Sequence, residues 1–152
     1  MFIAFVLHAE AQDSAYQTSL QQLRERLEEL QIQRADYRKI RPDDRSPKLP
    51  PAQEAERYSL LGQLFSDDPI WALQQQLQAD IDALADASKP EVRAANRAVL
   101  EDLKDLGALI SAFEGRVPTR EQADAMVAAL RQFIARRDVD GARAWAKKPQ
   151  IP

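Results

Sequence analysis

The side chains that could carry out acid–base or nucleophilic chemistry are few in this chain of 152 residues. Cysteine is absent, which excludes disulfides, thiol nucleophiles and cysteine-bound zinc, and which fits a reducing or an oxidising compartment equally. The single histidine, His8, lies next to an apolar run. Catalytic histidines need a partnered, polar setting, so we interpret His8 as a packing residue or part of a signal sequence. No phosphate-binding glycine motif is present, and we predict no cofactor.

Carboxylates are the remaining candidates for chemistry. Asp67 and Asp68 are adjacent, and Asp80, Asp82 and Asp86 follow within one helical segment. Such groups can bind hard cations or act as a paired acid and base. Asp68, however, directly precedes a helix that starts with proline, which is the position of an N-cap, and Asp82 and Asp86 lie one turn apart on a polar face. We therefore predict that the protein is not an enzyme and holds no metal, with a carboxylate-based metal-dependent enzyme as an alternative.

Composition and charge are those of a globular, slightly acidic protein. Hydrophobic residues make up 45%, charged residues make up 30%, and the formal net charge is −3. Nucleic-acid binding usually needs a basic surface, so we predict no nucleic-acid partner. The charge is uneven, because residues 66–114 hold ten acids and four bases, whereas residues 115–152 hold eight bases and four acids. Each segment is either a solvated surface or a docking surface for an oppositely charged partner.

The first twelve residues, MFIAFVLHAEAQ, fit three interpretations. Ala9 and Ala11 match the small-residue pattern of signal-peptide cleavage, but no Lys or Arg precedes the short apolar run. A packed N-terminal element is the second interpretation, and a β-strand, which aromatic and β-branched residues favour, is the third. The run is shorter than the roughly 20 residues of a membrane span. We favour a packed segment over residues 1–13 and a cytoplasmic location, whereas a truncated signal peptide would indicate a periplasmic or secreted protein.

From Ser14 onward, apolar residues recur at steps of three and four, which predicts helices throughout. The proline-rich residues 41–51, RPDDRSPKLPP, predict a linker after the first helix. The predicted fold class is therefore all-α, an up-down bundle of four to five helices that forms one domain over residues 14–152. The predicted helices cover residues 14–39, 52–65, 69–84, 90–113, 119–134 and 139–147.

Local signals predict where several helices begin and end. Ser14, Ser88 and Thr119 are each followed three residues later by Gln or Glu, which is the spacing of a capping box. Gly115 is a candidate C-terminal glycine for the fourth helix. We expect Trp145 to anchor the short last helix. The second helix is expected to bury one side, composed of Tyr58, Leu61, Leu64 and Phe65.

The first helix carries the clearest candidate for a partner interface. Its apolar positions follow heptad spacing over about three repeats, which is typical of a helix that packs along another helix. The heptad positions are Tyr16, Leu20, Leu23, Leu27, Leu30, Arg34 and Tyr37. They could pack on the rest of this chain, on a second copy or on a foreign helix. The candidate interface residues are Leu20, Leu23, Leu27, Leu30, Tyr37 and, because tryptophan is enriched at binding hot spots, Trp71.

Together these features predict a non-enzymatic helical protein that binds another protein. The Ala-, Leu-, Gln- and Arg-rich composition indicates a bacterial source. A toxin-neutralising role, as in immunity proteins, or a secretion-adaptor role fits best, because acidic helix surfaces can mask basic ones. The alternatives are a homodimer through the first helix and an exported, chaperone-like or structural protein of the periplasm. No stable membrane span is predicted.

Overall fold

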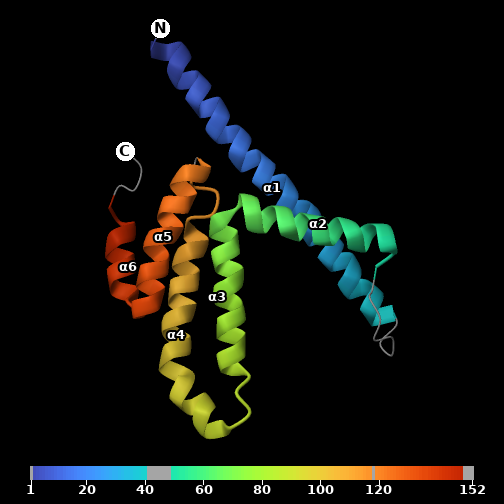
Figure 1. The fold of residues 1–152 in the computed structure, drawn as a ribbon, viewed down its shortest axis with the longest axis vertical. Coiled ribbons are helices and arrows are strands. Elements are labelled where there is room, and N and C mark those ends of the chain that lie inside the picture. The colour runs from blue at the N-terminus through green and yellow to red at the C-terminus, as the bar shows by residue number, and fades with distance from the viewer. Residues whose placement is uncertain (1, 41–48, 118, 149–152) are drawn as a thin grey trace. The chain divides into compact units, whose positions relative to one another are not determined.

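The structure, a computed structural model, describes the backbone of residues 2–40, 49–117 and 119–148. The described residues form six helices and no strand, which confirms the all-α prediction for this part of the chain (Figure 1). The helices are α1 (Phe2–Ile40), α2 (Pro51–Asp67), α3 (Pro69–Ala85), α4 (Pro90–Ala112), α5 (Arg120–Arg136) and α6 (Val139–Ala146). The chain divides into two compact units, unit 1 (residues 1–68) and unit 2 (residues 69–152). The predicted domain over 14–152 therefore comprises most of unit 1 and all of unit 2.

Helix α1 is longer than the sequence pattern predicts. It begins at Phe2, so Ser14 lies inside the helix rather than at its N-cap. The interpretation of the opening stretch as a β-strand is wrong, because a helix pairs its own backbone groups, whereas a strand would need a partner strand. Residues 41–48 of the predicted linker lie outside the described residues, and Pro51 already belongs to α2. None of the helices in the described ranges combines the length and apolarity that a membrane crossing requires.

In unit 1, α1 packs against α2. Leu27 and Leu30 of α1 are buried, as are Leu60 and Leu64 of α2. Charged side chains also connect the two helices. The pairs are Arg24 Nη1 with Asp68 Oδ2 at 2.5 Å, Arg26 Nε with Glu56 Oε1 at 2.6 Å and Arg34 Nε with Glu54 Oε1 at 3.6 Å. The arginines of α1 thus pair with acids of α2 and of the residue that follows it.

The buried side of α2 agrees with the predicted one at Leu64 and differs from it at the two aromatic residues. Tyr58 and Phe65 are 65% and 47% exposed, whereas Arg57, Leu60 and Leu64 are buried at spacings of three and four. The guanidinium of Arg57 lies 4.6 Å from the centre of the Tyr58 ring, and its Nη2 donates to Glu54 at 3.2 Å. An arginine has an aliphatic stem that can pack in a core while its charged end is paired. Tyr58 and Phe65 were therefore wrongly included in the predicted buried side of α2.

The pair of Arg26 and Glu56 makes a prediction about acid stability. The guanidinium of Arg26 lowers the pKa of the Glu56 carboxyl by donating hydrogen bonds to it at 2.6 and 3.0 Å. A carboxyl with a lowered folded-state pKa stabilises the fold above its unfolded-state pKa, and this stabilisation is lost as the pH falls through the folded-state value. We expect Arg26→Met to raise the pKa of Glu56 toward its ordinary value, as measured by NMR titration of the carboxyl carbon.

The pair of Arg26 and Glu56 also determines how far the free energy of unfolding of Arg26→Met, measured in urea, lies below that of the wild type. The difference in unfolding free energy between the two proteins should shrink as the pH is lowered through the pKa of Glu56, because protonation removes the pair from the wild type as well. Glu56→Gln is the matched control, since it removes the titrating group and keeps its size. An identical pKa for Glu56 in the wild type and in Arg26→Met would contradict the assignment.

Unit 2 is built around one hydrophobic core to which all four of its helices contribute. Fully buried residues include Leu106 and Ile110 of α4 and Leu130 of α5. Trp145 of α6 packs between two rings, with ring centres 5.7 Å from Phe113 and 6.0 Å from Phe133, as expected for an anchor of the last helix. The core residues are Ile70, Leu73, Leu77, Ile81, Leu103, Leu106, Ile110, Phe113, Val117, Ala123, Met126, Val127, Leu130, Val139 and Ala142.

The helix ends of unit 2 test the predicted caps. Thr119 caps α5 as predicted, because its Oγ1 accepts a hydrogen bond from the N–H of Gln122 at 3.2 Å. Gly115, just beyond α4, adopts a positive φ of 74°, as a helix-terminating glycine does. The predicted cap at Ser88 is wrong. Lys89 occupies the N-cap of α4 without a side-chain hydrogen bond, and Pro90 takes the first helical position, where its missing N–H costs little.

Candidate binding groove

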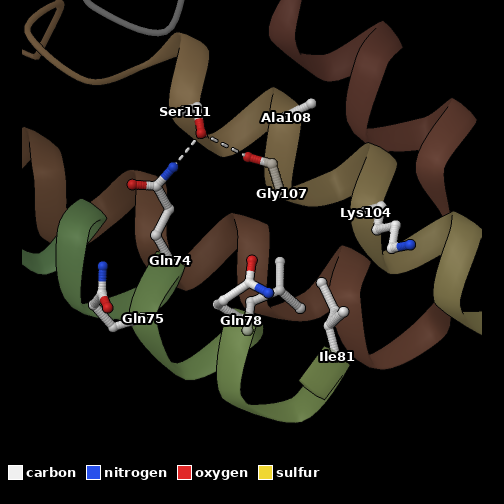
Figure 2. A pocket seen from close by; sticks show the side chains of 9 residues that line it. Gln74, Gln75, Gln78, Ile81, Lys104, Gly107, Ala108 and Ser111 are labelled. Atoms are coloured by element: carbon white, nitrogen blue, oxygen red, sulfur yellow. Dashed lines mark hydrogen bonds between the residues drawn. The ribbon is translucent and has the colours of Figure 1, made fainter. Parts of the chain in front are cut away.

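A cavity lies between α3 and α4, inside unit 2. It has a volume of about 340 Å³. Figure 2 shows how side chains from the two facing helices line it. We call this cavity the α3/α4 groove. Its lining residues are Gln74, Gln75, Leu77, Gln78 and Ile81 of α3, and Lys104, Gly107, Ala108 and Ser111 of α4.

The floor of the groove follows from small residues on α4. Gly107, Ala108 and Ser111 lie within about one helical turn of one another, so α4 presents little side-chain volume there. A Cβ atom built at Gly107 would lie 3.6 Å from Cδ2 of Leu77, which is an ordinary van der Waals contact. Leu77 of α3 therefore lies opposite Gly107 with room for a β-carbon between them, and the cavity of about 340 Å³ extends along this contact.

Amide and hydroxyl groups form the rim of the groove from its Ser111 end to its middle, where Gln78 lies (Figure 2). Nε2 of Gln74 donates to Oγ of Ser111, and this hydroxyl donates to the carbonyl of Gly107 at 3.1 Å (Figure 2). Nε2 of Gln78 donates to Oδ1 of Asp82 at 2.9 Å. Gln75 is exposed. Because each glutamine side chain carries both donors and an acceptor, this rim can bond to either kind of group on a ligand.

A positive charge lies at the other end of the groove. Lys104 is exposed, and within the described ranges it forms no ion pair or hydrogen bond. In Figure 2 it lies near Ile81, at the end of the groove away from Ser111. The groove thus combines an apolar floor, three glutamine amides, a hydroxyl and one cation. Such a site offers hydrogen bonds, charge and burial, which are the means of recognition, and amide side chains do not transfer protons near neutral pH.

The carboxylates considered for metal or acid–base chemistry are dispersed. Asp68 is buried and paired with Arg24 in unit 1. In unit 2, Asp82 accepts from Gln78, and Asp80 lines a separate cavity of about 180 Å³ between α3 and α5. Among the residues that the structure describes, no three or more His, Cys, Asp or Glu side chains come together as metal ligands would.

None of the predicted interface residues is among those that line the groove. Leu20, Leu27 and Leu30 are buried, and Leu23 and Tyr37 are half-buried on α1. Trp71 is 9% exposed and is not part of the unit 2 core. Sequence reasoning missed the groove, although two signals of it were present. One is the glutamine run QQQLQ at residues 74–78, and the other is the small-residue sequence GALIS at residues 107–111.

Comparison of the chain with known protein families, with curated proteins and with solved structures finds no match.

Proposed function

We propose that this chain is a non-enzymatic protein that binds another protein through the α3/α4 groove. The observation that carries the proposal is the lining of the groove, in which glutamine amides and Lys104 surround an apolar floor. A cavity of about 340 Å³ is near the lower limit of ligand sites, which range from about 300 to 1,000 Å³. It would accept a short stretch of a partner chain. A toxin-neutralising or secretion-adaptor role would use the groove in this way.

The heptad-spaced side of α1 is a second candidate binding surface, with less support than the α3/α4 groove. Leu20, Leu27 and Leu30 are buried, so a partner could use them only if their present packing were opened. Leu23 and Tyr37 are half-buried and are accessible without such a change. A homodimer through α1 and the up-down bundle arrangement both stay predictions. Sedimentation equilibrium of the wild type and of Leu23→Glu tests the homodimer.

A large side chain placed in the groove tests whether the partner binds there. Ala108 is exposed on α4 and lines the groove, so we expect Ala108→Trp to occupy the space without disturbing the core. The matched control is Ala128→Trp, which places the same side chain at an exposed position of α5 outside the groove. Each protein is immobilised, exposed to a lysate of the source organism, and its bound proteins are quantified by mass spectrometry.

The expected result is a bound protein that the wild type and Ala128→Trp retain and that Ala108→Trp loses. Circular dichroism must show equal helix content in all three proteins, so that the loss reports the groove rather than unfolding. If every bound protein is retained equally by Ala108→Trp, the groove is not the binding site and the proposal is wrong.

A further inference from the structure

We infer that the partner segment taken up by the α3/α4 groove is extended and acidic, with its peptide groups bonded to the glutamine amides and its carboxylates paired with Lys104 and Arg97. This inference rests on the proposed function and adds the chemistry of the ligand. Three observations lead to it: the kind of polar groups on α3, the column of cations on α4, and the distance over which both extend.

The glutamines favour an extended segment over a helical one. Gln74, Gln75 and Gln78 each present an N–H donor and a carbonyl acceptor to the groove or its rim. A helical ligand pairs its own peptide groups internally and has few to offer to such side chains. An extended chain exposes a donor and an acceptor at each residue, and these must find partners when they leave water. The amide-rich rim of α3 supplies such partners.

The cations on α4 favour an acidic segment. Arg97 and Arg93 precede Lys104 by seven and eleven residues, which is close to two and three helical turns, so all three lie on one side of α4. All three are exposed, and within the described residues none forms an ion pair or hydrogen bond. They are three of the four bases among residues 66–114. A column of unpaired cations beside a groove attracts and orients a negatively charged ligand.

Neighbouring acids do not neutralise this column through direct pairs. Asp105 of α4 lies 3.6 Å from Arg143 of α6 and is engaged there. Glu101 lies between Arg97 and Lys104 in the sequence, but it forms an ion pair with neither. Asp82, on the α3 side, accepts from Gln78. The Lys104 ammonium and the Arg97 guanidinium are therefore available to a ligand.

The groove and the cation column form one continuous track. Nδ2 of Asn96 donates to the carbonyl of Leu84 at 3.3 Å, so α3 and α4 remain in contact as far as the turn that carries Arg97. From Arg97 to Ser111 the rise along α4 is about 21 Å at 1.5 Å per residue. An extended chain covers this length with about six residues. A segment of that size can reach both the amides at one end and the cations at the other.

The experiment uses three fluorescein-labelled peptides of about eight residues, which are too short to be stable helices. They alternate alanine with glutamate, with glutamine or with lysine, and their binding to the full chain is measured by fluorescence anisotropy. We expect the glutamate peptide to bind about tenfold more tightly than the other two, and its binding to weaken as salt is added. Lys104→Glu should reduce its affinity about tenfold.

Lys147→Glu is the matched control, because it makes the same change of charge at an exposed position of unit 2 outside the groove. Equal binding of the three peptides, a preference for the lysine peptide, or equal effects of the two substitutions would each overturn the inference. Self-association of the chain that Ala108→Trp abolishes would also overturn it, since a second copy would then occupy the groove. If Ala108→Trp still loses a cellular partner in any of these cases, the proposed function stands and only the acidic, extended ligand is excluded.

Discussion

Replacing Leu106 by alanine is expected to lower the free energy of unfolding by about 3 kcal/mol, because the substitution removes a buried leucine and leaves a cavity. Leu106 has no exposed surface and lies in the core of unit 2. Its side chain is one of the largest that the described chain buries completely. Urea denaturation followed by circular dichroism measures the change.

Val92→Ala is the control for Leu106→Ala. Val92 is on the same helix but is 43% exposed, so its truncation should change the unfolding free energy by no more than about 0.5 kcal/mol. Equal changes in the free energy of unfolding for Leu106→Ala and Val92→Ala would contradict the burial of Leu106.

Arg24→Met is expected to destabilise the protein by about 3 kcal/mol, because it removes the guanidinium that pairs with the buried carboxylate of Asp68. The side chain of Asp68 is 4% exposed, and that of Arg24 is 22% exposed. The lower end of the usual range for a broken buried pair applies, since water reaches the guanidinium. Methionine keeps the aliphatic volume of the arginine, so the change reports mainly the lost charge. Urea denaturation again gives the magnitude.

Two further variants identify the cause of that loss. Arg24→Met combined with Asp68→Asn should be more stable than Arg24→Met alone, because the second change removes the buried charge with which Arg24 was paired. Arg26→Met removes a more exposed arginine of the same helix and should have a clearly smaller effect. If the double variant is less stable than Arg24→Met, the loss of stability does not come from the buried charge of Asp68.

Helix periodicity predicted most of the secondary structure, because each segment after Ser14 has apolar residues at steps of three and four. It failed at α1, where an apolar run of six residues carries no periodicity that distinguishes helix from strand. It also failed on α2. There the pattern counted Tyr58 as buried and did not include Arg57, whereas the ion pair with Glu54 and the aliphatic stem allow Arg57 to be buried.

The groove could not be predicted from the sequence, because it depends on which sides of two helices face each other. Gln74 and Ser111 are 37 residues apart, and only the packing of α3 against α4 brings them into contact. The small residues Gly107 and Ala108 were not a specific signal, since small residues occur on many helix surfaces. The acidic net charge of residues 66–114 suggested a basic partner, whereas the groove itself is lined by the cation of Lys104.

The division of the chain at residue 68 also separates its natural chromophores. All three tyrosines, Tyr16, Tyr37 and Tyr58, belong to unit 1, and both tryptophans, Trp71 and Trp145, belong to unit 2. Emission excited at the red edge of the absorption band comes from tryptophan alone and so follows residues 69–152, while tyrosine emission follows residues 1–68. A single unlabelled sample thus reports on the two units separately, through tyrosine emission from unit 1 and tryptophan emission from unit 2.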